Sequence, residues 1–473
     1  MIFTKIIVIR EKASRMTIKR KNDKVVRHEK GEMHMHLYGT QAISEEGHLT
    51  IGQVDTLELA KEYGTPLFVY DTALIRQRAR SFIDTFKKLG VKAEVAYASK
   101  AFACVAVYQL AAEENLSLDV VSGGELFTAL KAGFPAERIH FHGNNKSIAE
   151  LEQAFDANIG CIVVDNFYEI QLLKEISERR QQKMRILLRV TPGVEAHTHD
   201  FITTGQADSK FGFDLNNGQA DEAFQQTFNH AFLELLGLHC HIGSQIFDTA
   251  GFALAGEKLI DKISDWHKTH QFTCTVLNLG GGFGIRYTEE DAPLEPQVYV
   301  EDMITVVKNK ATVLGLTMPE IWIEPGRSLV GEAGTSLYTI GSQKTVPDVR
   351  KYIAVDGGMS DNIRPALYDA KYEAVIANRA HAPKDEIYTI AGKLCESGDK
   401  LIIDAKLQET ASGDTLAIFC TGAYGYSMAS NYNRVPRPAI VFVENGQHQL
   451  AVRRESYEDI VQNDLPLTLK KGE

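Results

Sequence analysis

The chain lacks the features of membrane proteins and of disulfide-rich proteins. Its 473 residues contain no apolar run close to the ~18 residues of a membrane-spanning helix, so no membrane association is expected. The six cysteines form no CxxC pair and follow no metal-ligand spacing, which favours a reduced, cytoplasmic protein. Residues 1–32 hold no uninterrupted apolar segment followed by a small-residue cleavage site, so they do not match a signal peptide.

Positive charge is also scarce over most of the chain, whose net charge is −11. Residues 1–32 carry ten Lys and Arg against four Asp and Glu, which leaves 41 basic and 58 acidic side chains elsewhere. Residues 33–473 thus have a net charge of −17 and would be repelled by the negatively charged backbone of a nucleic acid, so no nucleic-acid partner is expected. The basic residues 1–35 are interpreted as a disordered leader before a start near Met33 or Met35.

Short apolar runs alternate with helix-period segments from about residue 90 onward. The stretches between the runs predict amphipathic helices, such as Gly124–Ala132 after the N-cap Ser122, Asn166–Arg180 and Gly251–His267. Eight strands that alternate with helices predict an α/β fold, a parallel (β/α)8 barrel. A doubly wound open sheet remains the alternative, because periodicity does not show closure. The eight predicted strands are Val95–Ser99, Ser117–Val121, Ile139–His142, Cys161–Val164, Arg185–Val190, Leu236–Ile242, Val276–Leu279 and Ile321–Pro325.

The pattern changes after about Gly331, where strand-like runs crowd together between Gly-containing turns. These runs predict a mainly antiparallel β-domain. The expected organisation is a leader over 1–35, a segment over 36–65 that packs with the β-domain, a barrel over 66–331 and the β-domain over 332–473. The predicted strands of the β-domain are Leu337–Ile340, Tyr352–Val355, Tyr388–Ile390, Lys400–Ile403, Leu416–Phe419 and Ala439–Val443.

Ionisable residues gather where the predicted barrel strands end, which is where barrel enzymes carry their chemistry. Lys100 ends the first strand, and a lysine desolvated there could act as the nucleophile of a Schiff-base enzyme. Asp165 is interpreted as the cap of the helix that begins near Asn166, whereas His142 is left open between a structural and a functional role. The set of strand ends is Lys100, Asp119, His142, Asp165, Arg189, His241, Gly280–Gly284 and Glu324–Arg327.

The last two strand ends suit an anionic, aromatic cofactor. Gly280–Gly284 lets backbone N–H groups approach a phosphate, although it matches neither a P-loop nor GxGxxG. Glu324 could accept a hydrogen bond from a protonated pyridine nitrogen, and Arg327 could hold a phosphate or carboxylate. His241 would offer a flat face for stacking; a zinc pair with His239 is the competing idea, but no third ligand is apparent. Together with Lys100, these residues indicate pyridoxal 5′-phosphate and no metal.

Several longer motifs carry a resemblance to a known family. The chain is similar to the diaminopimelate decarboxylases, pyridoxal-phosphate enzymes of the alanine-racemase-like class, over about residues 36 to 460. One departure is Lys393, where the family usually has proline. The matching motifs are Tyr97–Ala101, Leu118–Glu125, His140–Lys146, His239–Gln245, Gly280–Ile285, Glu324–Val330, Cys395–Asp399, Gly422–Gly425 and Ser430–Pro438.

The resemblance implies that meso-2,6-diaminopimelate is decarboxylated to L-lysine and CO2, the last step of lysine biosynthesis by that route. It also implies that Lys100 holds the cofactor aldehyde and that Cys395 donates the proton that replaces the lost carboxylate. Cys395 and Glu396 would reach the active site of a partner subunit, so a homodimer with shared sites is expected. The implied cofactor contacts are Lys100, Asp119, His241, Ser244, Gly281, Gly282, Gly284, Glu324, Gly326, Arg327 and Tyr424. The implied substrate contacts are Arg327, Arg364, Tyr368, Glu396 and Tyr424.

Two alternatives differ in substrate and in class. A decarboxylase of the same class could act on ornithine, arginine or a D-amino acid, but these substrates lack the distal carboxylate that Arg364 suits. A homologue without the cofactor could be a binding or regulatory protein; intact Lys100, Glu324 and Cys395 argue against it.

Overall fold

The computed structural model describes residues 35–194 and 209–467, so the predicted leader lies almost wholly outside the described residues. The chain divides into two compact units, Met1–Tyr38 and Gly39–Glu473. The second unit contains every helix and every named strand of the described residues.

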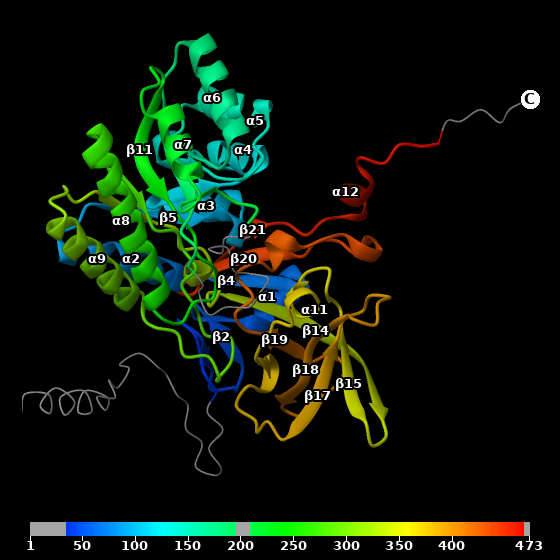
Figure 1. Cartoon of the computed structure of the whole chain (residues 1–473). Helices are drawn as coiled ribbons and strands as arrows, with labels where there is room; N and C mark the ends of the chain where they lie inside the picture. The colour runs from blue at the N-terminus through cyan, green and yellow to red at the C-terminus, as the bar shows by residue number, and fades with distance from the viewer. Residues whose placement is uncertain (1–34, 195–208, 468–473) are drawn as a thin grey trace, which may run out of the picture. The chain divides into compact units, whose positions relative to one another are not determined.

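Eight parallel strands form a closed barrel in the second unit (Figure 1). Strands β8 and β9 pair through Ile162 with Ile186 and Val164 with Leu188, and this pairing closes the sheet. The predicted barrel is therefore confirmed, and the open doubly wound sheet is excluded. The barrel strands are β5 (Ala93–Ala98), β6 (Ser117–Val120), β7 (Ile139–Phe141), β8 (Cys161–Val164), β9 (Met184–Thr191), β11 (Leu233–His239), β12 (Val276–Asn278) and β13 (Glu320–Ile323); the short β10 (Phe213–Asp214) pairs beside β9.

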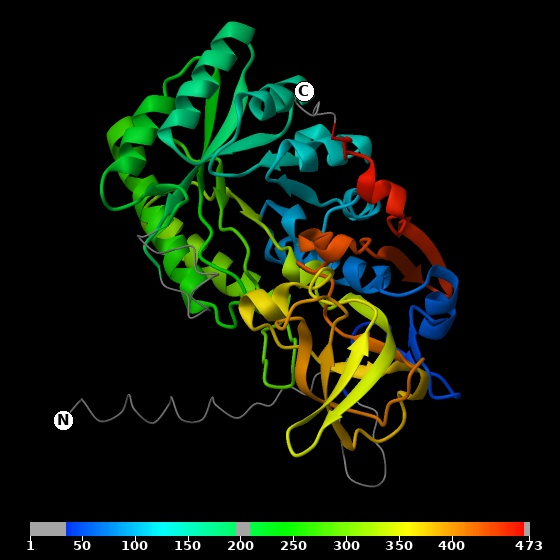
Figure 2. The same ribbon diagram turned by 90° about the vertical axis from the view of Figure 1, so that its right-hand side faces the viewer.

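Helices lie on the outside of the barrel strands (Figure 2). Ser122 caps α4 as predicted, because its side chain accepts a hydrogen bond from the Glu125 amide. The expectation for Asp165 is wrong: the side chain of Asn166 caps α6 and accepts from the Glu169 amide at 3.0 Å. Among the described residues, no helix is both long and apolar enough to cross a membrane. These helices are α2 (Thr72–Leu89), α3 (Val105–Glu113), α4 (Gly123–Lys131), α5 (Ile148–Ala157), α6 (Phe167–Arg180), α7 (Gln219–Thr227), α8 (Ala250–His270) and α9 (Pro296–Val313).

Apolar side chains fill the barrel, since parallel strands covered by helices are buried on both faces. One buried cluster draws Cys161 and Val163 from β8, Leu187 from β9 and Trp322 from β13. The His140 ring stacks on Trp322 with a centroid distance of 4.2 Å and an interplanar angle of 3°. The polar residues at the carboxyl ends of the strands therefore lie above a closely packed barrel interior.

A second sheet is mainly antiparallel, as predicted. Its central strand β4 (Leu67–Asp71) comes from the chain before the barrel and pairs with β14 and β20. Residues 67–71 thus belong to this sheet, although the sequence pattern placed them at the start of the barrel. The other strands are β14 (Gly334–Val346), β15 (Arg350–Val355), β16 (Ala374–Ile376), β17 (Glu386–Ala391), β18 (Lys400–Leu407), β19 (Thr415–Ile418), β20 (Ala439–Glu444) and β21 (Gln447–Val452).

Shorter elements complete the described chain. Helix α1 contacts strand β14 of the second sheet. These elements are β1 (Ala42–Ile43), β2 (Leu49–Ile51), β3 (Val54–Asp55), α1 (Thr56–Tyr63), α10 (Arg327–Val330), α11 (Arg364–Tyr368) and α12 (Tyr457–Val461).

A buried ion pair fixes the loop that follows β7. The Lys146 ammonium donates to Glu169 Oε1 at 2.7 Å and to the carbonyls of Gly143 and Val163 at 2.9 and 2.8 Å. Lys146 is 4% exposed and Glu169 is 2% exposed, so water cannot replace either partner. The loop that ends at this pair carries His142.

We expect Lys146→Ala to lower the free energy of unfolding by about 3–5 kcal/mol, because it leaves a buried carboxylate unpaired. Urea denaturation measures this loss. The exposed pair of Lys88 with Glu301 is the control, and Lys88→Ala should cost no more than about 0.5 kcal/mol. Equal costs for the two variants would contradict this reading of the buried pair.

Candidate active site

A cavity of about 560 Å³ opens at the carboxyl ends of the barrel strands. It brings together side chains from the barrel and from the chain segments of the second sheet. The predicted site residues that line it are Lys100, Asp119, His241, Ser244, Glu324, Arg327, Arg364, Tyr368 and Tyr424. A smaller hollow of about 40 Å³ adjoins it, shares Lys100, His241, Ser244, Glu324, Arg327 and Tyr424, and adds Gly282 and Gly326.

Lys100 lies in a 3-10 turn, Ser99–Ala101, directly after β5. Its side chain lines the cavity at the carboxyl end of that strand. The turn is held from the second sheet's side, because the Tyr424 amide donates to the Ala101 carbonyl at 2.8 Å. The amine is thus placed by two segments that lie far apart in the sequence.

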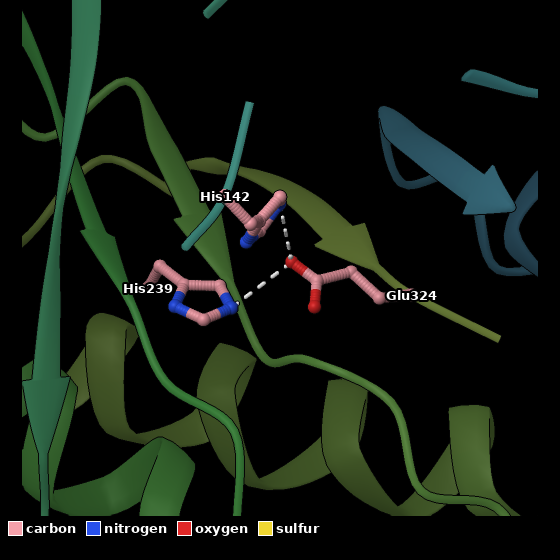
Figure 3. A group of neighbouring side chains, drawn as sticks. All are labelled: His142, His239 and Glu324. Atoms are coloured by element: carbon pink, nitrogen blue, oxygen red, sulfur yellow. Dashed lines mark ion pairs between the residues drawn. The ribbon is translucent and has the colours of Figure 1, made fainter. Parts of the chain in front are cut away.

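Glu324 forms the negative centre of the site (Figure 3). Its Oε1 lies 3.0 Å from His239 Nε2 and 3.5 Å from His142 Nε2, and both rings face this oxygen. The Asn278 side chain also donates to Oε1 at 2.7 Å. Burial raises the pKa of Glu324, but the imidazoles of His239 and His142 outweigh it and hold the pKa well below its usual range.

His142 lines the same cavity and lies beside Glu324, which favours the functional interpretation that the sequence left open. His142, His239 and Glu324 place their ligand atoms within 4.8 Å of one another, a spacing that a metal ion can use. The zinc pair weighed from the sequence combines His239 with His241. In the structure the neighbours of His239 are His142 and Glu324.

Asp119 connects Glu324 and its histidines to the packed interior of the barrel. One carboxylate oxygen lies 3.3 Å from His142 Nε2 and 3.3 Å from His140 Nδ1. Burial lowers the pKa of His140, but the carboxylates of Asp119 and Glu94 raise it to about 9, so the ring is an imidazolium at neutral pH. The other oxygen of Asp119 is buried and accepts no hydrogen bond from the described residues.

The glycine turn after β12 packs closely on the end of β13. A Cβ on Gly281 would lie 2.0 Å from the Glu324 carbonyl oxygen, so only glycine fits there. The Gly281 amide donates to His241 Nδ1 at 3.2 Å, which makes that nitrogen an acceptor. Burial, with the nearby Lys100 ammonium, lowers the pKa of His241 well below its usual range, so its ring is neutral.

Two buried arginines also line the cavity. Arg327 is 7% exposed and donates to Ser244 Oγ at 3.0 Å and to the Tyr287 hydroxyl at 2.5 Å. Arg364 is 8% exposed and donates to the Tyr372 hydroxyl at 2.5 Å. Neither tyrosine is predicted from the sequence. Tyr287 lies two residues after the matched motif Gly280–Ile285, and Tyr372 lies four residues after the implied substrate contact Tyr368.

Cys395 and Glu396 are exposed and do not line the cavity. Their loop is nevertheless ordered: the Cys395 amide donates to Asn433 Oδ1 at 2.8 Å, and Asp399 accepts from the amides of Met359 and Leu394. Nine of the predicted residues thus line the main cavity, while these two point elsewhere.

The residues present fit pyridoxal phosphate. The small hollow of about 40 Å³ is lined by Ser244, Arg327, Gly282 and Gly326, and hydroxyl, guanidinium and backbone N–H groups are donors that suit a phosphate. Arg327 Nε is buried and has no hydrogen-bond partner among the described residues, so a donor is spare at this place. Lys100 borders both hollows, within reach of an aldehyde.

We expect Gly281→Ala to weaken the binding of pyridoxal phosphate to the apoprotein by at least about tenfold, because the turn must move away from Glu324. Absorbance titration with the cofactor measures this. In Gly341→Ala, the added Cβ meets its nearest atom, the Ala354 carbonyl oxygen, at 3.7 Å, so this control should bind as the wild type does. Unchanged affinity in Gly281→Ala would remove the turn from the cofactor site.

Comparison with known proteins agrees with this geometry. Residues 72–331 match the family model described as pyridoxal-dependent decarboxylase, pyridoxal binding domain. The chain is 65% identical to diaminopimelate decarboxylase from Bacillus subtilis over 432 residues, which cover 91% of this chain and 98% of that relative. It is 47% identical to the enzyme of the same name from Staphylococcus aureus, with 90% and 99% covered.

A solved structure shows the same likeness in three dimensions. Diaminopimelate decarboxylase from M. jannaschii, in a complex with L-lysine, superposes with a TM-score of 0.85 at 35% identity and covers 90% of this chain and 98% of that one. The fold of this chain is thus shared with a solved structure described as a diaminopimelate decarboxylase. This chain belongs to the diaminopimelate decarboxylase family of pyridoxal-dependent decarboxylases.

Proposed function

We propose that this protein decarboxylates meso-2,6-diaminopimelate to L-lysine and CO2 with pyridoxal phosphate. One observation carries the proposal: a single cavity holds Lys100 together with two buried arginines, Arg327 and Arg364. An amine for the cofactor and two guanidiniums for carboxylate and phosphate groups suit an amino acid with a carboxylate at each end. The 65% identity to the Bacillus subtilis enzyme supports the same activity.

The cofactor would lie with its phosphate toward the small hollow. Ser244, the Gly281–Gly284 turn and Arg327 would hold the phosphate, and Gly326 leaves room for this approach. When bound, the cofactor supplies an electron sink for the pair released from the broken Cα–carboxylate bond. Lys100 would supply the amine that holds its aldehyde.

Three side chains would tune the cofactor ring. Glu324, kept anionic by the neighbouring imidazoles, would hold a proton on the pyridine nitrogen. The neutral His241 ring would stack on one face of the cofactor without repelling its positive charge. Asp119 would complete the wall beneath the ring through its contact with His142.

The far end of the substrate carries an ammonium and a carboxylate, and paired charges bind such a group. Arg364 would bind this distal carboxylate, with Tyr368 beside it and Tyr424 close to both substrate and phosphate. Glu396 would pair with the distal ammonium. Cys395 would deliver the proton that replaces the carboxylate lost at the D-configured centre.

The exposure of Cys395 and Glu396 supports a homodimer with shared sites, because neither side chain lines the cavity of its own chain. A twofold partner would bring its own copies of both residues to this cavity. We place the protein in the cytoplasm, because its cysteines form no CxxC pair and follow no metal-ligand spacing, which suits a reducing compartment.

The substrate is tested by measuring CO2 and lysine formation with meso-, L,L- and D,D-diaminopimelate, ornithine and arginine. We expect turnover of the meso isomer and a loss of at least about a thousandfold in Lys100→Ala. Borohydride should abolish the visible cofactor band of the wild type. Turnover of ornithine without turnover of diaminopimelate would contradict the proposed substrate.

Shared sites are tested by mixing two inactive variants, Lys100→Ala and Cys395→Ala. If Cys395 serves the partner's site, each hybrid dimer has one intact site, and random exchange should restore about a quarter of the wild-type activity. If both residues act within one chain, every site keeps a defect and mixing restores nothing. Each variant mixed with itself is the control.

A further inference from the structure

Arg327 and Arg364 differ from Arg189, the other buried arginine among the described residues, in what holds them. Arg189 lies 3.8 Å from Asp165, and the partly buried Arg78 lies beside Glu332, so each has a carboxylate within ion-pair distance. No carboxylate among the described residues lies within 4.0 Å of the guanidinium of Arg327 or Arg364. Two buried positive charges thus share one cavity, and neither forms an ion pair within residues 35–194 and 209–467.

Tyr287 and Tyr372 take the place of those carboxylates. The Tyr287 hydroxyl accepts from Arg327, while its ring lies 4.8 Å from the Arg364 guanidinium carbon. The Tyr372 hydroxyl accepts from Arg364, and the Tyr372 ring meets Tyr287 edge-on at 5.5 Å. Both tyrosines are buried, at 6% and 5% exposure, so the four side chains form one packed group.

A phenol fixes a guanidinium without cancelling its charge. Its hydroxyl accepts one hydrogen bond, and its ring attracts the cation, but it adds no negative charge. A carboxylate in the same place would neutralise the arginine and compete with a carboxylate of the ligand. The tyrosine pair therefore keeps the arginines in place and leaves their charges for an anionic ligand.

We propose that Tyr287 and Tyr372 are positioning residues that make this cavity select amino acids bearing a distal carboxylate. The proposal rests on the proposed function, in which Arg364 binds that carboxylate. Tyr372 fixes Arg364 by its hydroxyl, and Tyr287 supports Arg364 by its ring while its hydroxyl fixes Arg327. Neither tyrosine takes part in bond breaking, so both act on ligand selection rather than on the chemical step.

The test compares two ligands of the holoenzyme that differ in one group. L-lysine keeps the distal carboxylate, and 1,5-diaminopentane lacks it. In Tyr372→Phe, the dissociation constant of L-lysine should rise about tenfold, because a hydrogen bond to a charged group is lost. That of 1,5-diaminopentane should stay within about twofold, and KM for meso-diaminopimelate should rise while kcat changes little. Calorimetry gives both dissociation constants.

Tyr299→Phe is the matched control, because Tyr299 is equally buried and its hydroxyl donates to the Ile246 carbonyl at 2.7 Å, outside the cavity lining. This variant also loses one buried hydroxyl, but its affinity for both ligands should equal that of the wild type. A parallel loss for both ligands in Tyr372→Phe, or no loss for either, would overturn the proposal.

A second pair of variants separates ring from hydroxyl and covers the case in which Tyr372→Phe does not fold. Tyr287→Phe keeps the ring beside Arg364 and should preserve the preference for L-lysine over 1,5-diaminopentane. Tyr287→Leu removes the ring, and that preference should fall about fivefold. Equal preferences in the two variants would overturn the role of the ring. Wild-type protein that releases no lysine from diaminopimelate would instead contradict the proposed function, whatever these variants show.

Discussion

Closure of the barrel between β8 and β9 is the constraint on which the site depends. When Ile162 pairs with Ile186, eight parallel strands become a ring, and all their carboxyl ends meet at one rim. Residues as distant in sequence as Lys100 and Arg327 then line the same cavity. An open sheet would spread the same strand ends along a line and would not enclose a ligand.

The second sheet adds side chains to that rim, because its strand β14 follows the last barrel strand closely in the sequence. The short helix α10 leads from β13 into β14. Strand β4, which precedes the barrel in the sequence, pairs with β14 in the same sheet. Arg364 and Tyr424 reach the cavity from this side. The hydrogen bond from the Tyr424 amide to Ala101 joins the two parts next to Lys100.

Charge within the cavity is divided between two ends that are stabilised differently. Glu324 is buried, and imidazoles and an amide surround it, so its negative charge is compensated by the protein. Arg327 and Arg364 are held by neutral phenols, so their positive charge is left for the ligand. This division suits a cofactor that carries a protonated ring nitrogen and a phosphate, together with a substrate that carries carboxylates.

The sequence by itself determined the number and order of the barrel strands, the change to an antiparallel sheet and the residues at the strand ends. These follow from local patterns: apolar runs, glycine turns and motifs whose chemistry is readable residue by residue. Only the tertiary structure decided the closure, the entry of β4 into the second sheet and the pairing of Tyr287 with two arginines. Such contacts join residues far apart in the chain, and no local period records them.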